Sequence, residues 1–119
     1  MFNDPTEANI LTLEPLTARA AITMVVAARE VGIPLIVISG RRNAMQNASA
    51  GGAPGSHHLT GKAFDVAVLG YTRAQIPLPW WEMLGSWAEQ NLGLRWGGRF
   101  VHDGERDVNH FDYGGSLMV

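Results

Sequence analysis

The segment SHHLTGKAFDVAVL, residues 56–69, places two adjacent histidines and a glycine ahead of an apolar run. The β-branched and aromatic residues of KAFDVAVL predict a buried strand over residues 62–69. Asp65 interrupts this run, and a carboxylate is costly to bury unless it is hydrogen-bonded, paired or bound to a cation. Side chains alternate along a strand, so Asp65 shares its face with the small residues Ala63 and Ala67. The segment is either an ordinary strand with a hydrogen-bonded aspartate or part of a metal site.

Two long helices are expected, one on each side of this segment along the chain. The first spans residues 14–31, where apolar side chains recur at helical spacing. Its packed face would contain Leu16, Ala20, Met24, Ala27 and Val31. The second spans residues 79–93, and one of its faces would contain Trp81, Leu84, Ala88 and Leu92. A short helical turn is expected over residues 43–48.

The other strand candidates are short. They are IPLIVIS at residues 33–39, LRWGGRF at 94–100 and NHFDY at 109–113. A polar turn, VHDGERD, separates the last two. Helices and strands do not alternate regularly, which predicts an α+β fold with a mainly antiparallel sheet and flanking helices. The length of 119 residues predicts a single domain over residues 1–119.

The composition excludes several classes of protein. The chain has no cysteine, which excludes disulfide scaffolds, cysteine nucleophiles and thiolate metal sites. A formal charge of -2 gives no electrostatic reason to expect a nucleic-acid partner. There is no secretory signal pattern and no apolar run of membrane-spanning length. We therefore expect a protein made in the cytoplasm, with no membrane insertion. We also expect it to be a monomer.

Three residues could together bind a metal. A catalytic zinc has three protein ligands and an open position for water, and His58, Asp65 and His110 would supply those ligands. Asp107, three residues before His110, would stand beside the site and take a proton from the water. Arg42 follows a strand end and could bind a carboxylate or an oxyanion there, or it could lie in a solvated turn.

These pieces together resemble one family. SHHLTGKAFD is similar to the S-x-H-x-x-G-x-A-x-D signature of the D-alanyl-D-alanine metallopeptidases. That family includes VanY-type carboxypeptidases, VanX-type dipeptidases and phage L-alanyl-D-glutamate endopeptidases. GRRNAMQ resembles its G-x-R-x-x-x-Q segment, and RWGGRF followed by DVNHFD resembles the phage-type ending. The resemblance covers a motif-bearing core of about residues 33–113.

The resemblance implies a role for each matched residue. It makes His58, Asp65 and His110 the ligands of one Zn²⁺ per chain, Asp107 the general base and acid, and Arg42 the group that steadies the developing charge. The residues expected to bind substrate or support the site are Ser56, Gln46, Arg41 and Trp96. His57 and His102 are not expected to be ligands. The implied fold is the small α+β hedgehog/D,D-peptidase type.

The resemblance also implies an activity. The phage-type ending favours a zinc endopeptidase that hydrolyses the L-Ala–D-Glu bond of peptidoglycan stem peptides, as an endolysin. Such a protein, made without a signal peptide, would act on the wall in the periplasm after another factor releases it. A D-Ala–D-Ala carboxypeptidase or dipeptidase is the first alternative. A zinc-stabilised wall-binding module without catalysis is the second.

Overall fold

The computed structural model of the chain describes residues 4–51, 56–102 and 104–113. A four-stranded antiparallel sheet runs in the order β1-β2-β6-β3. Its strands are β1 (Leu35–Ser39), β2 (Ala63–Val68), β6 (His110–Asp112) and β3 (Arg95–Trp96). Four α-helices accompany the sheet in the described residues: α1 (Thr6–Ile10), α2 (Pro15–Glu30), α3 (Ala44–Ser49) and α4 (Leu78–Leu92). The predicted α+β fold with a mainly antiparallel sheet is confirmed.

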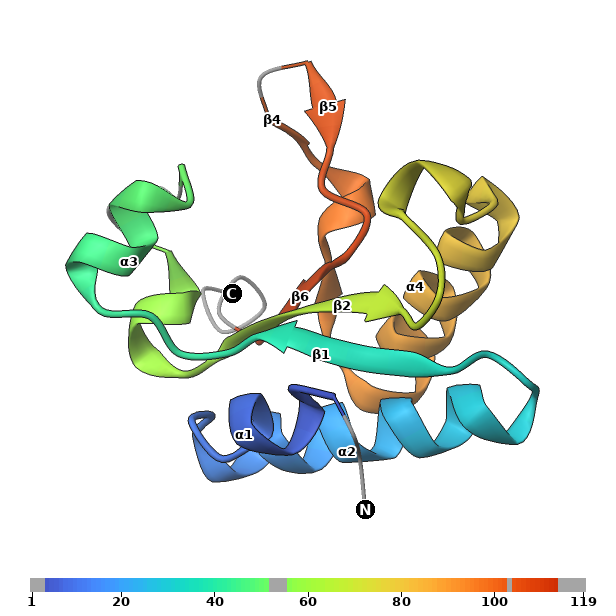
Figure 1. Cartoon of the computed structure of the whole chain (residues 1–119), viewed down its shortest axis with the longest axis horizontal. Helices are drawn as coiled ribbons and strands as arrows, with labels where there is room; N and C mark the ends of the chain where they lie inside the picture. The colour runs from blue at the N-terminus through green and yellow to red at the C-terminus, as the bar shows by residue number, and fades with distance from the viewer. Residues whose placement is uncertain (1–3, 52–55, 103, 114–119) are drawn as a thin grey trace.

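Figure 1 shows α1 and α2 side by side beneath β1, with α4 beside the other end of the sheet. The segment expected to be a polar turn forms a hairpin instead, made of β4 (Val101–His102) and β5 (Glu105–Arg106). This hairpin projects from the sheet at the top of Figure 1. No helix in the described ranges combines the length and the apolar character needed to cross a bilayer.

Helix α2 begins where the sequence predicts, but its buried face is different. Glu14 caps the first turn, since its carboxylate accepts hydrogen bonds from the backbone N–H groups of Leu16 and Thr17. The predicted face is wrong at its ends, because Leu16 is 58% exposed and Val31 is 69% exposed. Ala20 and Met24 are buried as predicted, and the other buried residues of the helix are Thr17, Ala21, Val25 and Ala28. Thr17 is fully buried, and its hydroxyl donates to Glu14, so this buried polar group is paired. The small alanines let the helix lie close to its neighbours.

Helix α1 covers the free edge of the sheet, and the sequence reasoning did not predict it. The backbone N–H of Val37 in β1 donates to Thr6 Oγ1 at 3.0 Å. The Asn9 side-chain amide donates to the Val37 carbonyl oxygen at 2.9 Å. These two side chains take the place of a further strand, so the polar groups of Val37 at this edge are paired. A helix of only five residues gives too little periodicity to be recognised in the sequence.

The core lies on one face of the sheet and depends on close packing around Trp96. Phe64 of β2 stacks on Phe111 of β6 with ring centroids 5.7 Å apart, and both are fully buried. Helix α4 buries Trp81, Leu84 and Ala88, as its predicted face requires, and Leu92 is partly buried. Gly85 of α4 lies against the Trp96 ring, where an added Cβ would be 2.1 Å from Trp96 Cδ2.

The contact between Gly85 and Trp96 gives a stability prediction. Alanine has a higher helix propensity than glycine by about 1 kcal/mol, but overpacking a core costs about 1–3 kcal/mol. We expect the clash to dominate, so that Gly85→Ala lowers the free energy of unfolding measured in urea. Gln90→Ala, at an exposed position of the same helix, should change it by less than about 0.5 kcal/mol. A Gly85→Ala protein as stable as the parent would contradict the packing of Trp96 on α4.

Candidate metal centre

The pairing of β2 with β6 brings two of the predicted ligands together. Asp65 lies directly opposite His110 in this antiparallel pair, so both side chains project from the same face. His110 Nδ1 lies 3.2 Å from Asp65 Oδ1. His58 Nε2 lies 3.4 Å from the same oxygen. One ligand atom from each of the three residues lies within 4.8 Å of the other two, so the predicted set converges.

His58 reaches this point from a tight turn. Residues His57–Thr60 form the 3₁₀ helix η1, which ends at Gly61 with φ +74°. A side chain at Gly61 would be strained there, and a Cβ would lie 3.0 Å from the backbone nitrogen of Glu14. Both histidines thus lie in a helical turn and not in an extended segment. His58 is 2% exposed, whereas His57 is half-buried and lines the neighbouring cleft.

The outer nitrogen of each histidine is fixed by an acceptor. His58 Nδ1 lies 2.8 Å from the Gly40 carbonyl oxygen, which can only accept, so Nδ1 donates to it and Nε2 is the nitrogen directed toward Asp65. His110 Nε2 lies 2.6 Å from Asp112 Oδ2, which directs Nδ1 toward Asp65. Metal-binding histidines are held in this way, by a hydrogen bond from the ring nitrogen that does not bind the metal. Two imidazole nitrogens and a carboxylate oxygen are a donor set that suits zinc.

An ion pair between Arg95 and the buried carboxylate of Asp112 supports His110, and the sequence reasoning did not identify it. Asp112 is fully buried and accepts from Arg95 Nε at 2.9 Å and Arg95 Nη2 at 3.0 Å. His110 and Asp112 are two residues apart on a strand, and this spacing could have indicated that they share a face. The position of Arg95 follows from its pairing opposite Asp112 in the sheet, which no local sequence pattern displays.

The electrostatics of the centre favour a positive charge between its carboxylates. Burial opposes ionisation of Asp65, yet hydrogen bonds from His110 and His58 hold its pKa well below the usual carboxylate range. Burial also opposes the charged form of His110, but Asp112 and Asp65 raise its pKa to about 9. The same carboxylates that favour a proton on this ring favour a metal cation next to Nδ1. The residues present therefore fit a zinc ion.

Asp107 lies beside the ligand set and faces the cleft. Its Oδ2 is 3.9 Å from His110 Nδ1, and its side chain is 46% exposed. Gly97 allows this position, since a Cβ there would lie 2.3 Å from the Asp107 carbonyl oxygen. Trp96 Nε1 also donates to the Val108 carbonyl oxygen at 2.7 Å, which fixes the loop between Asp107 and His110.

Arg42 and Ser56 also line the cleft. Arg42 Nη2 donates to Asp65 Oδ2 at 2.9 Å, so the guanidinium holds the carboxylate oxygen that the two histidines do not approach. Ser56 Oγ accepts from the backbone N–H of His58 at 3.2 Å and caps η1. Both residues thus contact a member of the ligand set.

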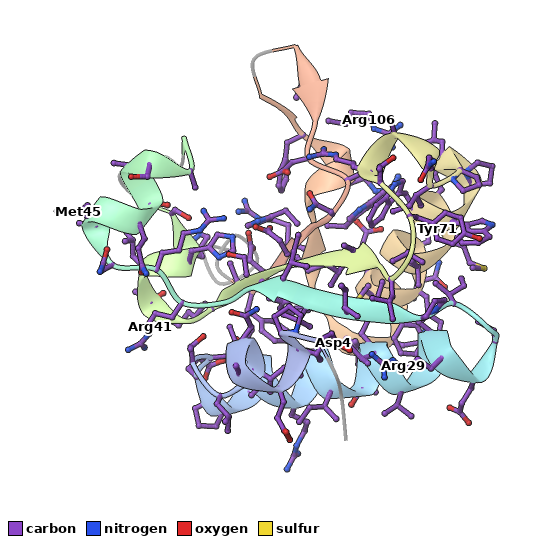
Figure 2. The ribbon with its side chains drawn as sticks, viewed as in Figure 1. Asp4, Arg29, Arg41, Met45, Tyr71 and Arg106 are labelled. Carbon is purple, nitrogen blue, oxygen red and sulfur yellow. The ribbon has the colours of Figure 1, made fainter. Side chains whose placement is uncertain are left out.

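Three residues expected to bind substrate or support the site lie outside the cleft lining. Gln46 accepts from the backbone N–H of Asn43 and caps α3, because the two residues occupy the two ends of a capping box. Arg41 donates to the Thr60 carbonyl oxygen at 3.0 Å, and Figure 2 shows its side chain below the loop, toward α1. Trp96 is 1% exposed, so it packs in the core, and its bond to Val108 fixes the loop that carries Asp107. The side chain of His102 lies outside the described part of the chain.

The cleft beside the centre has a volume of about 670 Å³. Four arginines and three aspartates are among the described residues that line it: Arg42, Arg73, Arg95, Arg106, Asp65, Asp107 and Asp112. Phe100 and Val101 add an apolar wall. The cleft therefore joins the metal ligands, an exposed carboxylate and several cationic side chains in one space.

The buried contact between Asp112 and His110 gives a prediction about metal affinity. Asp112→Asn should weaken zinc binding by about 10- to 100-fold, because supporting partners of this kind contribute that much to metal affinity. Asp65→Ala should abolish stoichiometric zinc binding, since it removes a ligand. His57→Ala should keep the parent affinity. A competitive chelator titration measures all three, and thermal unfolding shows whether each variant is folded. Unchanged zinc affinity in folded Asp112→Asn would contradict the supporting role.

A family model described as Peptidase M15 matches residues 6–102 of the chain. The matched range contains Arg42, His58 and Asp65 and ends before Asp107 and His110. The structure therefore adds the third ligand and the neighbouring carboxylate to what the match covers. No curated protein matches the chain in sequence.

Several solved structures have a similar fold. The Serratia marcescens L-Ala D-Glu endopeptidase ChiX gives a TM-score of 0.65 at 23% identity, covering 93% of this chain and 87% of that one. The LdcB LD-carboxypeptidase gives 0.58 at 23% identity, over 89% and 61% of the two chains. The vancomycin resistance D,D-pentapeptidase VanY, in complex with Zn(II), gives 0.56 at 16% identity, over 87% and 73%. At these identities the likeness establishes the fold.

Proposed function

Because the chain belongs to the Peptidase M15 family, we propose that it is a zinc-dependent peptidase that acts on peptidoglycan stem peptides. The family match confirms the sequence prediction of a peptidase. The convergent set His58, Asp65 and His110 is the observation that carries the proposal. This set opens into a cleft that also contains the exposed carboxylate of Asp107, and a zinc that served only structure would not need such a group.

The side chains of the cleft have separate tasks in the proposed hydrolysis. A zinc ion held by His58, Asp65 and His110 would act as a Lewis acid toward the scissile carbonyl and lower the pKa of the attacking water. Asp107 accepts the proton of that water and delivers it to the leaving amine. Arg42 holds Asp65 in place and, from the same position in the cleft, steadies the negative charge that develops on the substrate oxygen.

The L-Ala–D-Glu bond is the proposed point of cleavage. Two observations support this choice: the phage-type ending of the sequence, and the likeness in fold to an L-Ala D-Glu endopeptidase over most of both chains. We propose further that the protein works as a monomeric phage endolysin. It would be made in the host cytoplasm and would reach the periplasmic wall after release by another factor.

Mass spectrometry of purified peptidoglycan after digestion tests the cleaved bond. Cleavage of L-Ala–D-Glu should leave muramic acid that carries alanine alone and release peptides that begin with D-Glu. Loss of terminal D-Ala would instead identify a carboxypeptidase, and no change in any fragment would contradict hydrolysis. The zinc-loaded protein and the same protein after chelation should be compared, with activity expected in the first.

Asp107→Asn tests catalysis against wall binding alone. The amide keeps the size of the side chain but cannot accept the proton, so kcat should fall by about 10²- to 10⁴-fold. Zinc content and thermal stability should stay close to those of the parent, because Asp107 is half-exposed and outside the ligand set. Undiminished lysis by a folded, zinc-loaded Asp107→Asn protein would favour a binding module over an enzyme.

A further inference from the structure

We propose that Arg73 and Arg106 form a carboxylate subsite at one end of the cleft, which binds an acidic residue of the stem peptide. Both arginines line the cleft that holds the metal centre. Neither belongs to the motifs that identified the centre. The inference rests on the proposed function, since it names the feature of the substrate that the same cleft would recognise.

The four cleft arginines divide into two pairs by their partners. Arg42 is bound to Asp65 at 2.9 Å, and Arg95 is bound to Asp112 at 2.9 Å. Within the described ranges, Arg73 and Arg106 form no ion pair with a carboxylate. Arg42 and Arg95 thus each have a carboxylate partner inside the protein, whereas Arg73 and Arg106 have none among the described residues and can offer their full charge to a ligand.

Backbone carbonyl groups hold both guanidinium groups in place. Arg106 Nε donates to the Gly98 carbonyl oxygen at 2.8 Å, and its guanidinium carbon lies 5.5 Å from the centre of the Trp96 ring. Arg73 Nη2 donates to the Arg106 carbonyl oxygen at 3.1 Å, so its side chain crosses from η2 (Arg73–Gln75) to β5. A guanidinium has five N–H donors, and each of these bonds uses one. The remaining donors suit the two oxygens of a carboxylate.

The two arginines stand at the boundary of a second hollow. This hollow has a volume of about 610 Å³, and its lining includes Arg73 and Arg106 together with Ile76, Trp81 and Val108. None of the three metal ligands is among its lining residues. Figure 2 shows Arg106 on the side of the β4–β5 hairpin that faces η2 and α4. A peptide that extends from the metal centre toward the second hollow therefore passes these guanidinium groups.

The charge of the cleft favours an anionic ligand. Its described lining has one more arginine than it has aspartates, and a divalent cation bound by the ligand set would add to the positive charge. The whole chain has a formal charge of -2, so the positive cleft is a local feature. A net positive charge of this kind attracts anionic ligands.

Stem peptides offer carboxylates at two places near the proposed point of cleavage. D-Glu is linked onward through its γ-carboxyl, which leaves its α-carboxylate next to the scissile bond. Where the following residue is diaminopimelic acid, it carries a second free carboxylate. The shared chemistry is a substrate carboxylate bound by two arginines, and amidation of each position separately distinguishes the two sources.

Kinetics with three synthetic muramoyl tetrapeptides test the subsite. One has both carboxylates free, one is amidated at D-Glu, and one is amidated at the diamino acid. On the free peptide, Arg73→Gln should lower kcat/KM by about 10- to 100-fold, mainly through KM, because it removes a charge-assisted contact. The parent enzyme should lose a similar factor on one of the amides. Arg73→Gln should lose nothing further on that amide, which identifies the carboxylate.

Three further variants make the test specific. Arg73→Lys keeps the charge and should recover part of the lost kcat/KM. Arg106→Gln should repeat the pattern of Arg73→Gln, and if it fails to fold, Arg73→Gln decides alone. Arg19→Gln removes the same charge from an exposed position of α2 outside the cleft, and should match the parent. Zinc content and thermal unfolding confirm that each variant retains its centre and fold.

Two results would overturn the subsite. The first is cleavage of the free peptide by both glutamine variants with the kcat/KM of the parent. The second is a loss of kcat/KM in these variants, relative to the parent, that is equal on all three peptides. If the parent cleaves none of the peptides, the proposed function fails. Calorimetric binding of the same peptides to the zinc-loaded parent then decides the subsite separately. Equal affinity for the free and amidated forms would contradict it.

Discussion

The antiparallel register between β2 and β6 is the constraint on which both the core and the metal centre depend. It places Asp65 opposite His110 on one face and Phe64 opposite Phe111 on the other. Because side chains alternate along a strand, a slip of one residue would exchange the two faces. The stacked phenylalanines would then leave the core, and the ligand set would enter it. The packing energy of the core therefore also keeps the centre in register.

The outer contacts of the ligands explain why distant parts of the chain are needed for one small site. The loop after β1 supplies the Gly40 carbonyl oxygen for His58 and the guanidinium of Arg42 for Asp65. Strand β3 supplies Arg95, which holds the buried carboxylate beside His110. Trp96, next along β3, fixes the loop that carries Asp107 through its bond to Val108. His58 and Asp65 are thus oriented by the loop after β1, and His110 by Asp112 of its own strand, which Arg95 of β3 holds in place.

The sequence identified those site residues that a pattern of neighbouring residues marks. Asp65 in an apolar strand, Gly61 in a turn, and the order of the family motifs were enough to predict that His58, Asp65 and His110 converge. Asp112 and Arg95 were missed because their pairing depends on the sheet register. Gln46 and Arg41 occupy motif positions or neighbour them, but their side chains bond to nearby backbone groups. A motif match predicts that a residue belongs to the neighbourhood of the site. The direction in which its side chain points depends on the local backbone turn.

The charges around the ligand set compensate one another in a way that suits a Lewis acid. Arg42 contacts Asp65, and Arg95 contacts Asp112, so two cations balance two anions around the histidines. The outer partner of His58 is the neutral Gly40 carbonyl group. A divalent cation held by this set would keep its charge largely uncompensated toward the cleft, where it can polarise a substrate. Asp107 lies outside the compensated group and is open to solvent, so its carboxylate stays available to accept a proton.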